Sequence, residues 1–171
     1  MDSNREKLLN FVKTNGPLLP VQVSKYLNTD IIFAGAMLSE LVAHNHVFVT
    51  NTKRGGSPFY YTKGQEPKIS QLGIYLSGKE KEAFELIIQK KIIKDSEALP
   101  WQRVALRAIK DFAVAIEVEF KGDKEIFWKW YDSSDQEVNE IVSKILDTTP
   151  EEEQEIIQPQ EILEESPKEI P

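Results

Sequence analysis

Three cations in the second half of the chain recur at a spacing that would place them on one side of a helix. Arg103, Arg107 and Lys110 occupy positions i, i+4 and i+7, and at about 100° per residue they share an arc of roughly 60°. Such a stripe is typical of surfaces that contact nucleic-acid phosphates. The alternative is an ordinary solvated face whose cations pair with Asp111 or other nearby acids. The opposite side of this helix is expected to be buried, and it carries the apolar residues Val104, Ala105, Ala108, Ile109 and Phe112.

A second group of cations surrounds a glycine pair. Lys53 and Arg54 precede Gly55-Gly56, and they are backed in the sequence by Lys63 and Lys68. A glycine pair permits a tight hairpin turn, so the first two cations are expected at a hairpin tip, where they could reach phosphate. Phosphate contacts set position and affinity but carry no sequence information. The alternative is a solvated tip whose charges guard the hairpin against aggregation.

Residues that could support catalysis or metal binding are few. Glu119-Phe120-Lys121 matches half of a nuclease metal motif, with Asp95 or Asp111 as conceivable partners, but three residues in a charged chain are a weak match. The only histidines are His44 and His46, and the lack of cysteine excludes thiolate metal sites, disulfides and a cysteine nucleophile. No nucleophile–base pair and no phosphate-binding glycine loop is evident. We therefore expect a non-enzyme with no metal, no cofactor and no small-molecule substrate.

An aromatic run, Phe127-Trp128-Lys129-Trp130-Tyr131, alternates as a strand would. Trp128 and Trp130 then share one face with Ile126, while Phe127 and Tyr131 share the other. Exposed tryptophans beside a lysine could stack on single-stranded bases. Core packing is the more common fate of such a pair, and we expect it here.

The elements that position Lys53 and Arg54 are predicted over residues 4–63. Helices are expected at 4–14, from Pro20 to Leu27, and from Ile31 to about His44, with Asp30 as the N-cap of the third. Two β-rich runs follow, at 47–51 and 59–62. The positions spaced to form a shared core are Val23, Leu27, Ala34, Leu38 and Leu41.

The second half repeats this order in abbreviated form. A helix starting at Gly78 is followed by a break at 95–100, a helix at 101–112, a hairpin of strands 113–120 and 125–131, and a helix at 136–146. The predicted organisation is a first domain at 1–68, a connector at 69–77, a second α+β unit at 78–149 and an acidic tail at 150–171, which we expect to be disordered. The fold class is thus α+β. A tandem arrangement of two related units is one reading, and a plain second α+β domain is the other.

Residues 23–47 resemble the helix-turn-helix of bacterial and archaeal winged-helix regulators. A small residue occupies the turn in those families, and here it is Asn28; a polar residue caps the recognition helix, and here it is Asp30. Residues 55–61 and 103–113 also look like those of an archaeal group of winged-helix proteins that has no assigned function, and that resemblance covers residues 1–147. The resemblance implies a winged helix-turn-helix fold, and it implies DNA as the usual partner.

One helix departs from the regulator pattern. The outward arc of the predicted recognition helix holds Ile32, Ala36, Ser39, Glu40 and Ala43, and no cation. Direct reading of base edges depends on donors such as Arg, Asn or Gln, so sequence-specific reading by this helix is not expected. The alternative function is a protein interaction, with a partner or a second copy packing on Ile32, Ala36, Ser39 and Ala43.

The charge is unevenly distributed along the 171 residues. Residues 1–68 hold eight Lys and Arg against five Asp and Glu, residues 69–149 hold twelve against fifteen, and residues 150–171 hold one against eight, for a net charge of −7. A mildly basic head with an acidic tail suits a nucleic-acid-binding protein. No apolar run is long enough for a membrane span and the N-terminus lacks a signal-peptide profile, so we expect a cytoplasmic protein. The leading expectation is DNA binding of low specificity, in transcription or chromosome maintenance.

Overall fold

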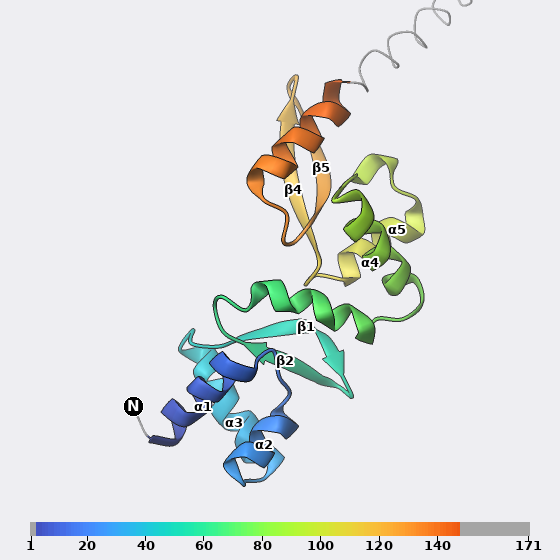
Figure 1. Cartoon of the computed structure of the whole chain (residues 1–171). Helices are drawn as coiled ribbons and strands as arrows, with labels where there is room; N and C mark the ends of the chain where they lie inside the picture. Colours follow the sequence, from blue (N-terminus) through green and yellow to red (C-terminus); the bar gives the residue numbers. More distant parts are fainter. Residues whose placement is uncertain (1–2, 148–171) are drawn as a thin grey trace, which may run out of the picture.

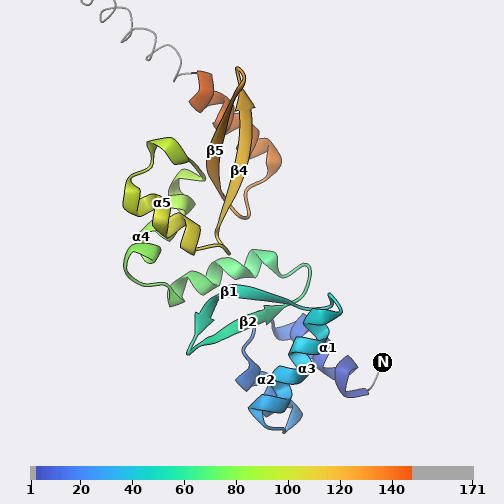
Figure 2. The same ribbon diagram turned by 180° about the vertical axis from the view of Figure 1, so that it is seen from behind.

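The computed structural model describes residues 3–147, which form helices and two small antiparallel sheets (Figures 1 and 2). The elements in chain order, with η for a 3₁₀ helix, are α1 (Ser3–Asn15), α2 (Pro20–Leu27), α3 (Ile31–Ala43), β1 (Phe48–Arg54), β2 (Ser57–Tyr61), η1 (Glu66–Tyr75), α4 (Gly78–Lys90), β3 (Ile92–Lys94), η2 (Asp95–Glu97), α5 (Pro100–Ala108), β4 (Ala113–Phe120) and β5 (Asp123–Trp130). A further helix covers residues 135–147. The α+β class is therefore confirmed. The predicted acidic tail, 150–171, lies outside the described residues.

The first three helices share one core with the hairpin that follows them. Its buried residues are Leu8, Val12, Leu18, Val23, Ala34, Met37, Leu38, Leu41, Val47 and Tyr60, with Leu27 packed against them. The five predicted core positions are thus confirmed. Local signals set the boundaries of α2 and α3. Asn28 takes a left-handed φ of 52° after α2, and the Asp30 carboxylate accepts the Phe33 N–H at 2.8 Å at the start of α3.

Strands β1 and β2 form a longer hairpin than the sequence predicted. Gly55 and Gly56 alone make the turn, with φ values of 58° and 82°, and two consecutive positive values are what a type I′ turn requires. Leu18, between α1 and α2, pairs with the free edge of β2: its N–H donates to the Tyr60 carbonyl at 2.9 Å, and its carbonyl accepts the Tyr60 N–H at 2.8 Å. The hairpin therefore extends to the glycine pair and is anchored to the helices at its other edge.

The predicted connector at 69–77 is mostly helical, because Glu66–Tyr75 forms the 3₁₀ helix η1. Ile69 and Leu72 recur at i and i+3, which matches the three residues per turn of a 3₁₀ helix and places both on its buried side. They join a core that includes Phe59 of β2 and Phe84 of α4. In Figure 1, η1 crosses the hairpin on the side away from α1–α3. The segment therefore links the two halves of the molecule through a common core.

The second half is organised around a sheet of order β3-β5-β4. Helices α4 and α5 lie on one side of β4 and β5, and helix 135–147 lies on the other (Figures 1 and 2). The alternation along β5 divides its side chains between these layers: Trp128 and Trp130 join the core of α4 and α5, and Phe127 joins the core beneath helix 135–147. Both tryptophans are buried at 7% exposure, so the expected core role is confirmed.

The second half repeats the element order of the first. Helix α4, edge strand β3, the short η2, helix α5 and hairpin β4–β5 correspond in order to α1, the Leu18 bridge, α2, α3 and hairpin β1–β2. The last strand of each hairpin is the central one, because β2 lies between β1 and Leu18 and β5 lies between β4 and β3. The short turn η2, in the predicted break at 95–100, stands in this order where the first half has the helix α2. None of the helices within residues 3–147 is long and apolar enough to cross a membrane.

Candidate interaction surfaces

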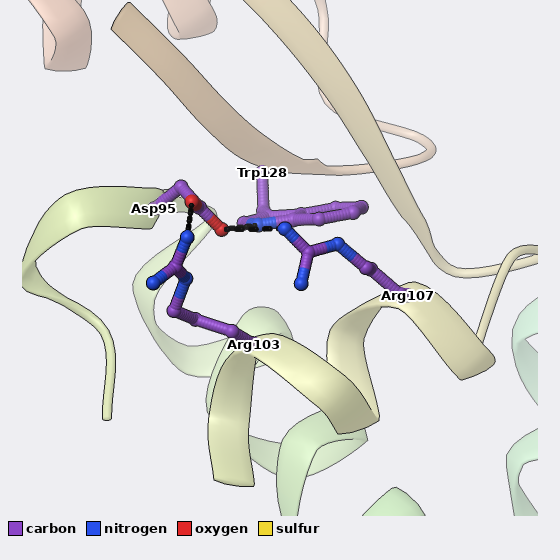
Figure 3. A network of polar contacts seen from close by, with 4 residues as sticks. All are labelled: Asp95, Arg103, Arg107 and Trp128. Carbon is purple, nitrogen blue, oxygen red and sulfur yellow. Dashed lines mark hydrogen bonds and ion pairs between the residues drawn. The ribbon is translucent and has the colours of Figure 1, made fainter. Parts of the chain in front are cut away.

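The predicted basic stripe on α5 is part of an ion-pair network around Asp95 (Figure 3). Asp95 starts η2, and its side chain is only 8% exposed. Arg103 Nη2 lies 2.9 Å from Asp95 Oδ2, and the Trp128 indole N–H donates to Asp95 Oδ1 at 2.9 Å. Arg107 Nη2 lies 4.0 Å from the same Oδ1. Both arginines therefore point toward a buried carboxylate of their own chain.

Electrostatics keep this carboxylate ionised. Burial alone would raise the pKa of Asp95, but the hydrogen bonds from Trp128 and Arg103, with the charges of Arg103 and Arg107, hold that pKa below its ordinary value. The three ionised groups carry a net charge of one positive unit. Arg103 Nε is buried and has no hydrogen-bond partner within residues 3–147. The network can still attract an anion, but one of its two cations is already neutralised.

Two further predictions about α5 are wrong. The helix ends at Ala108, so Lys110 lies in the turn beyond it and does not extend the stripe. Val104, expected in the core, is 68% exposed, and Leu106 is buried in its place. The buried side of the helix, Ala105, Leu106 and Ile109, is rotated from the predicted one because the helix packs against both α4 and the β3–β5 sheet.

Asp111 pairs with backbone amides rather than with the cations of α5. Its two carboxylate oxygens accept the N–H groups of Asn51 at 2.8 Å and Thr52 at 2.6 Å. The Asn51 amide group also donates to the Ala108 carbonyl at 3.0 Å. These two residues belong to β1 at an irregularity of its pairing with β2, where their N–H groups would otherwise lack strand partners. Asp111 thus ties the first hairpin to the second half of the molecule.

The cations near the first hairpin do not form one cluster. Lys53 and Arg54 are exposed beside the Gly55–Gly56 turn, and the Arg54 guanidinium lies 5.4 Å from the centre of the Tyr75 ring. Lys63 is also exposed, but it follows β2 at the opposite end of the hairpin. At about 3.3 Å per residue it lies roughly 20 Å along the strand from the turn. The six predicted nucleic-acid-binding cations are therefore distributed over separate places.

The outward side of α3 is apolar and uncharged. Ile31, Ile32 and Phe33 are 50%, 83% and 52% exposed. The side chains of Ala36, Ser39 and Ala43 continue this exposed side toward the end of the helix. Glu40, the one charged residue of α3, is partly buried and pairs with Arg5 of α1. The four predicted interaction residues, Ile32, Ala36, Ser39 and Ala43, therefore lie on one surface.

The exposure of Ile31 and Phe33 was missed in the sequence. The signal is present, because three consecutive apolar residues span about 200° of a helix and cannot all face one core. Tyr26 of α2 is also 52% exposed, and it stacks on Phe11 with ring centres 4.0 Å apart. A hollow of about 230 Å³ also borders this side of α3, lined by Phe33, Ala36, Met37 and Glu40 with Asn4 and Arg5.

The weak nuclease match does not form a site. Asp95 and Asp111 are both engaged elsewhere, as described above, and Glu119 faces Lys124 across the hairpin of β4 and β5. Lys121 lies in the turn of that hairpin with a φ of 51°. Within the part of the chain that the structure describes, no three His, Cys, Asp or Glu side chains gather as metal ligands.

No protein-family model matches the chain, and no curated protein matches it.

Proposed function

We propose that this protein is a non-enzymatic winged-helix protein that assembles through α3, with the outward side of α3 packed against the same helix of a second copy. The observation that carries the proposal is the exposure of Ile31, Ile32 and Phe33 on a helix whose outward side has no charge. Large apolar side chains that their own chain leaves exposed are typical of interfaces. A phosphate-binding helix would instead present cations there.

The winged-helix assignment rests on element order and strand order. Helix, extended segment, two helices and a hairpin follow one another over residues 3–61, and the last strand is the central one. The capped α3 occupies the position of a recognition helix in that plan. The second half, with its similar order, supports a tandem arrangement.

A second copy fits this surface because it offers both a projection and a hollow. Ile32 projects from α3, and the hollow beside Ala36 and Phe33 has a volume of about 230 Å³. In a two-fold contact each copy can insert its projection beside the hollow of the other. Gly35 and Ala36 let the helices approach closely, since even an added Cβ at Gly35 would meet no atom within 4 Å. The two charged residues that line the hollow, Arg5 and Glu40, are paired with each other, so the contact brings no unpaired like charges together.

Sedimentation equilibrium over a range of protein concentrations tests this proposal. We expect the full chain to dimerise and Ile32→Glu to be monomeric, because two carboxylates would be buried at the two-fold contact. Val104→Glu is the matched control, since Val104 is 68% exposed on α5, outside this surface. It should leave the dimer intact. A full chain that stays monomeric at every concentration, or equal dissociation of both variants, would overturn the proposal.

A second candidate function, DNA contact of low specificity, is favoured by one observation: Lys53 and Arg54 are both exposed and flank the hairpin turn. Neither has an ion pair within residues 3–147. Two phosphate contacts per chain predict a log–log salt slope of about −2 for binding to duplex DNA.

Gel-shift titrations in salt distinguish this second candidate. Lys53→Ala with Arg54→Ala should remove most of the affinity and flatten the salt slope. Lys121→Ala with Lys124→Ala, at the other hairpin tip, is the matched control. It should change both the affinity and the salt slope less. If the two pairs weaken binding equally, the contact is diffuse and the first hairpin is no DNA-binding element.

A further inference from the structure

A buried lysine lacks a close partner in the second half of the molecule. The Lys94 side chain, at the end of β3, is only 8% exposed. Its Nζ makes no hydrogen bond to any residue that the structure describes, and the nearest carboxylate oxygen, Glu97 Oε1, lies 3.9 Å away. That acid is itself 59% exposed, so the ion pair is long and open to water. The stem of Lys94 is thus buried, while its ammonium group has no close carboxylate partner and borders a cavity where an anion could approach it.

Lys94 lines a cavity that could hold such an anion. The cavity has a volume of about 380 Å³ and lies between α4, β3, η2, α5 and helix 135–147. Its apolar walls include Leu86, Ile93, Ile141 and Ile145, and its polar groups are Lys90, Lys94, Glu97 and Gln102. The two lysines exceed the single acid by one positive charge. The volume falls within the range of small-molecule sites, in which a few polar groups orient the ligand.

We propose that this cavity binds a small molecule with one anionic group on an aliphatic body. The anion accepts hydrogen bonds from the Lys94 ammonium, with Lys90 adding charge at the opening, and the aliphatic part packs against the isoleucines and Leu86. A purely polar anion would leave the apolar walls without contacts, and a neutral lipid would leave the Lys94 ammonium without an anionic partner. The site is separate from α3 and from the first hairpin. The experiments on this cavity therefore test a proposal that is independent of the function proposed above.

Octanoate is a suitable probe, and octan-1-ol is its uncharged counterpart. Titration calorimetry on the full chain should show octanoate binding more tightly than octan-1-ol. Lys94→Met keeps the length and apolar stem of the side chain but removes the charge. It should weaken octanoate binding by about tenfold or more, the usual effect of losing a charge-assisted hydrogen bond, and leave octan-1-ol binding unchanged. Lys110→Met, in the turn after α5, controls for a general loss of positive charge and should leave both unchanged.

The thermal midpoint without ligand is a second readout. The long pair with Glu97 is open to water and contributes little stability, so Lys94→Met should keep or raise the midpoint of the free protein. A lowered midpoint with octanoate binding unchanged would mean that Lys94 only serves the Glu97 pair, and the proposal would be wrong. No binding of octanoate to the full chain at any concentration tested would also overturn it.

The acidic residues that follow helix 135–147 in the sequence are the competing occupant, because Glu151, Glu152 and Glu153 begin four residues beyond Asp147. The full chain carrying Glu→Gln at these three positions separates the two cases. A small-molecule site predicts similar octanoate affinity with and without the changes. Octanoate binding that appears only in the triple variant would assign the cavity to the chain's own carboxylates and overturn the proposal.

Discussion

The helix before each hairpin occupies the same place in the element order, yet α3 and α5 have opposite surfaces. α3 turns Ile31, Ile32 and Phe33 outward, and its one acid is paired with Arg5. α5 turns Arg103 and Arg107 toward the buried Asp95. In the first half the exposed side of the helix is free of charge, and in the second half charge is used to hold the fold together. Equivalent positions in a repeated order therefore need not have equivalent roles.

The largest effect on stability is expected from Asp95, the buried partner of the α5 arginines. Asp95→Ala removes the partner of both arginines and the acceptor of the Trp128 N–H, and Trp128 is buried. We expect the free energy of unfolding to fall by about 2–3 kcal/mol, less than for a fully buried pair because the arginines are about half exposed. Denaturant unfolding followed by tryptophan fluorescence measures this. An unchanged midpoint would mean that the network does not hold the second half together.

The same network predicts a dependence of stability on pH. The pKa of Asp95 is lower in the folded chain than its ordinary value of 3.8, so the carboxylate stabilises the fold fully above that value. This contribution is lost as the pH falls below about 4 toward the folded-state pKa. Asp95→Asn, which keeps an acceptor for Trp128, should show a smaller loss of stability between pH 6 and pH 3 than the unaltered chain. Parallel pH profiles would contradict this.

A further prediction concerns the segment that joins the two halves. A Cβ added at Gly73 of η1 would overlap the ring of Phe84, which is held in the core against Phe112 and Trp130. Gly73→Ala should lower the free energy of unfolding by about 2 kcal/mol, because an overpacked core forces side chains to shift. If thermal unfolding of this variant matches that of the original chain, η1 is loosely packed and does not link the two halves through a common core.

The hydrogen bonds of Asp111, which join the first hairpin to the second half, should contribute less to the free energy of unfolding. Asp111→Ala leaves the N–H groups of Asn51 and Thr52 without their acceptor, and we expect a loss of about 1–2 kcal/mol. Hydrogen exchange provides the specific readout, since these two amides should exchange faster while amides in α1 do not. Equal acceleration throughout the chain would indicate global unfolding instead of a local contact.

The smallest expected effect is a gain in stability. Gly35 lies inside α3, and an added Cβ meets no atom within 4 Å. Gly35→Ala should therefore raise the free energy of unfolding by about 0.5–1 kcal/mol through helix propensity alone. The sign is opposite to that of Gly73→Ala, so thermal melts of the two variants compare an open helix with a packed one. Because the added methyl group also lies near the proposed contact, a simultaneous loss of dimer would show how closely the two α3 helices approach.

Predictions from neighbouring residues agreed well with the structure. The Asp30 cap, the turn at Asn28 and the glycine pair of the first hairpin depend on φ preferences and on hydrogen bonds within about four residues, so they can be recognised in the sequence. The five core positions of the first unit and the burial of the two tryptophans follow similarly from helical and strand periodicity.

The tertiary structure decided which partners the charges have. Nothing in the local sequence pairs Arg103 with Asp95 or Asp111 with the backbone of β1, because these contacts depend on how α5 and the first hairpin pack. The same packing exposed Val104 and buried Leu106, since a helix that contacts both a neighbouring helix and a sheet buries a side that its own periodicity does not specify. Residue spacing along the chain indicated most of the helices, strands and turns, but not η1 or the end of α5. Whether a cation or an apolar residue remained available for a partner depended on contacts between residues far apart in the sequence.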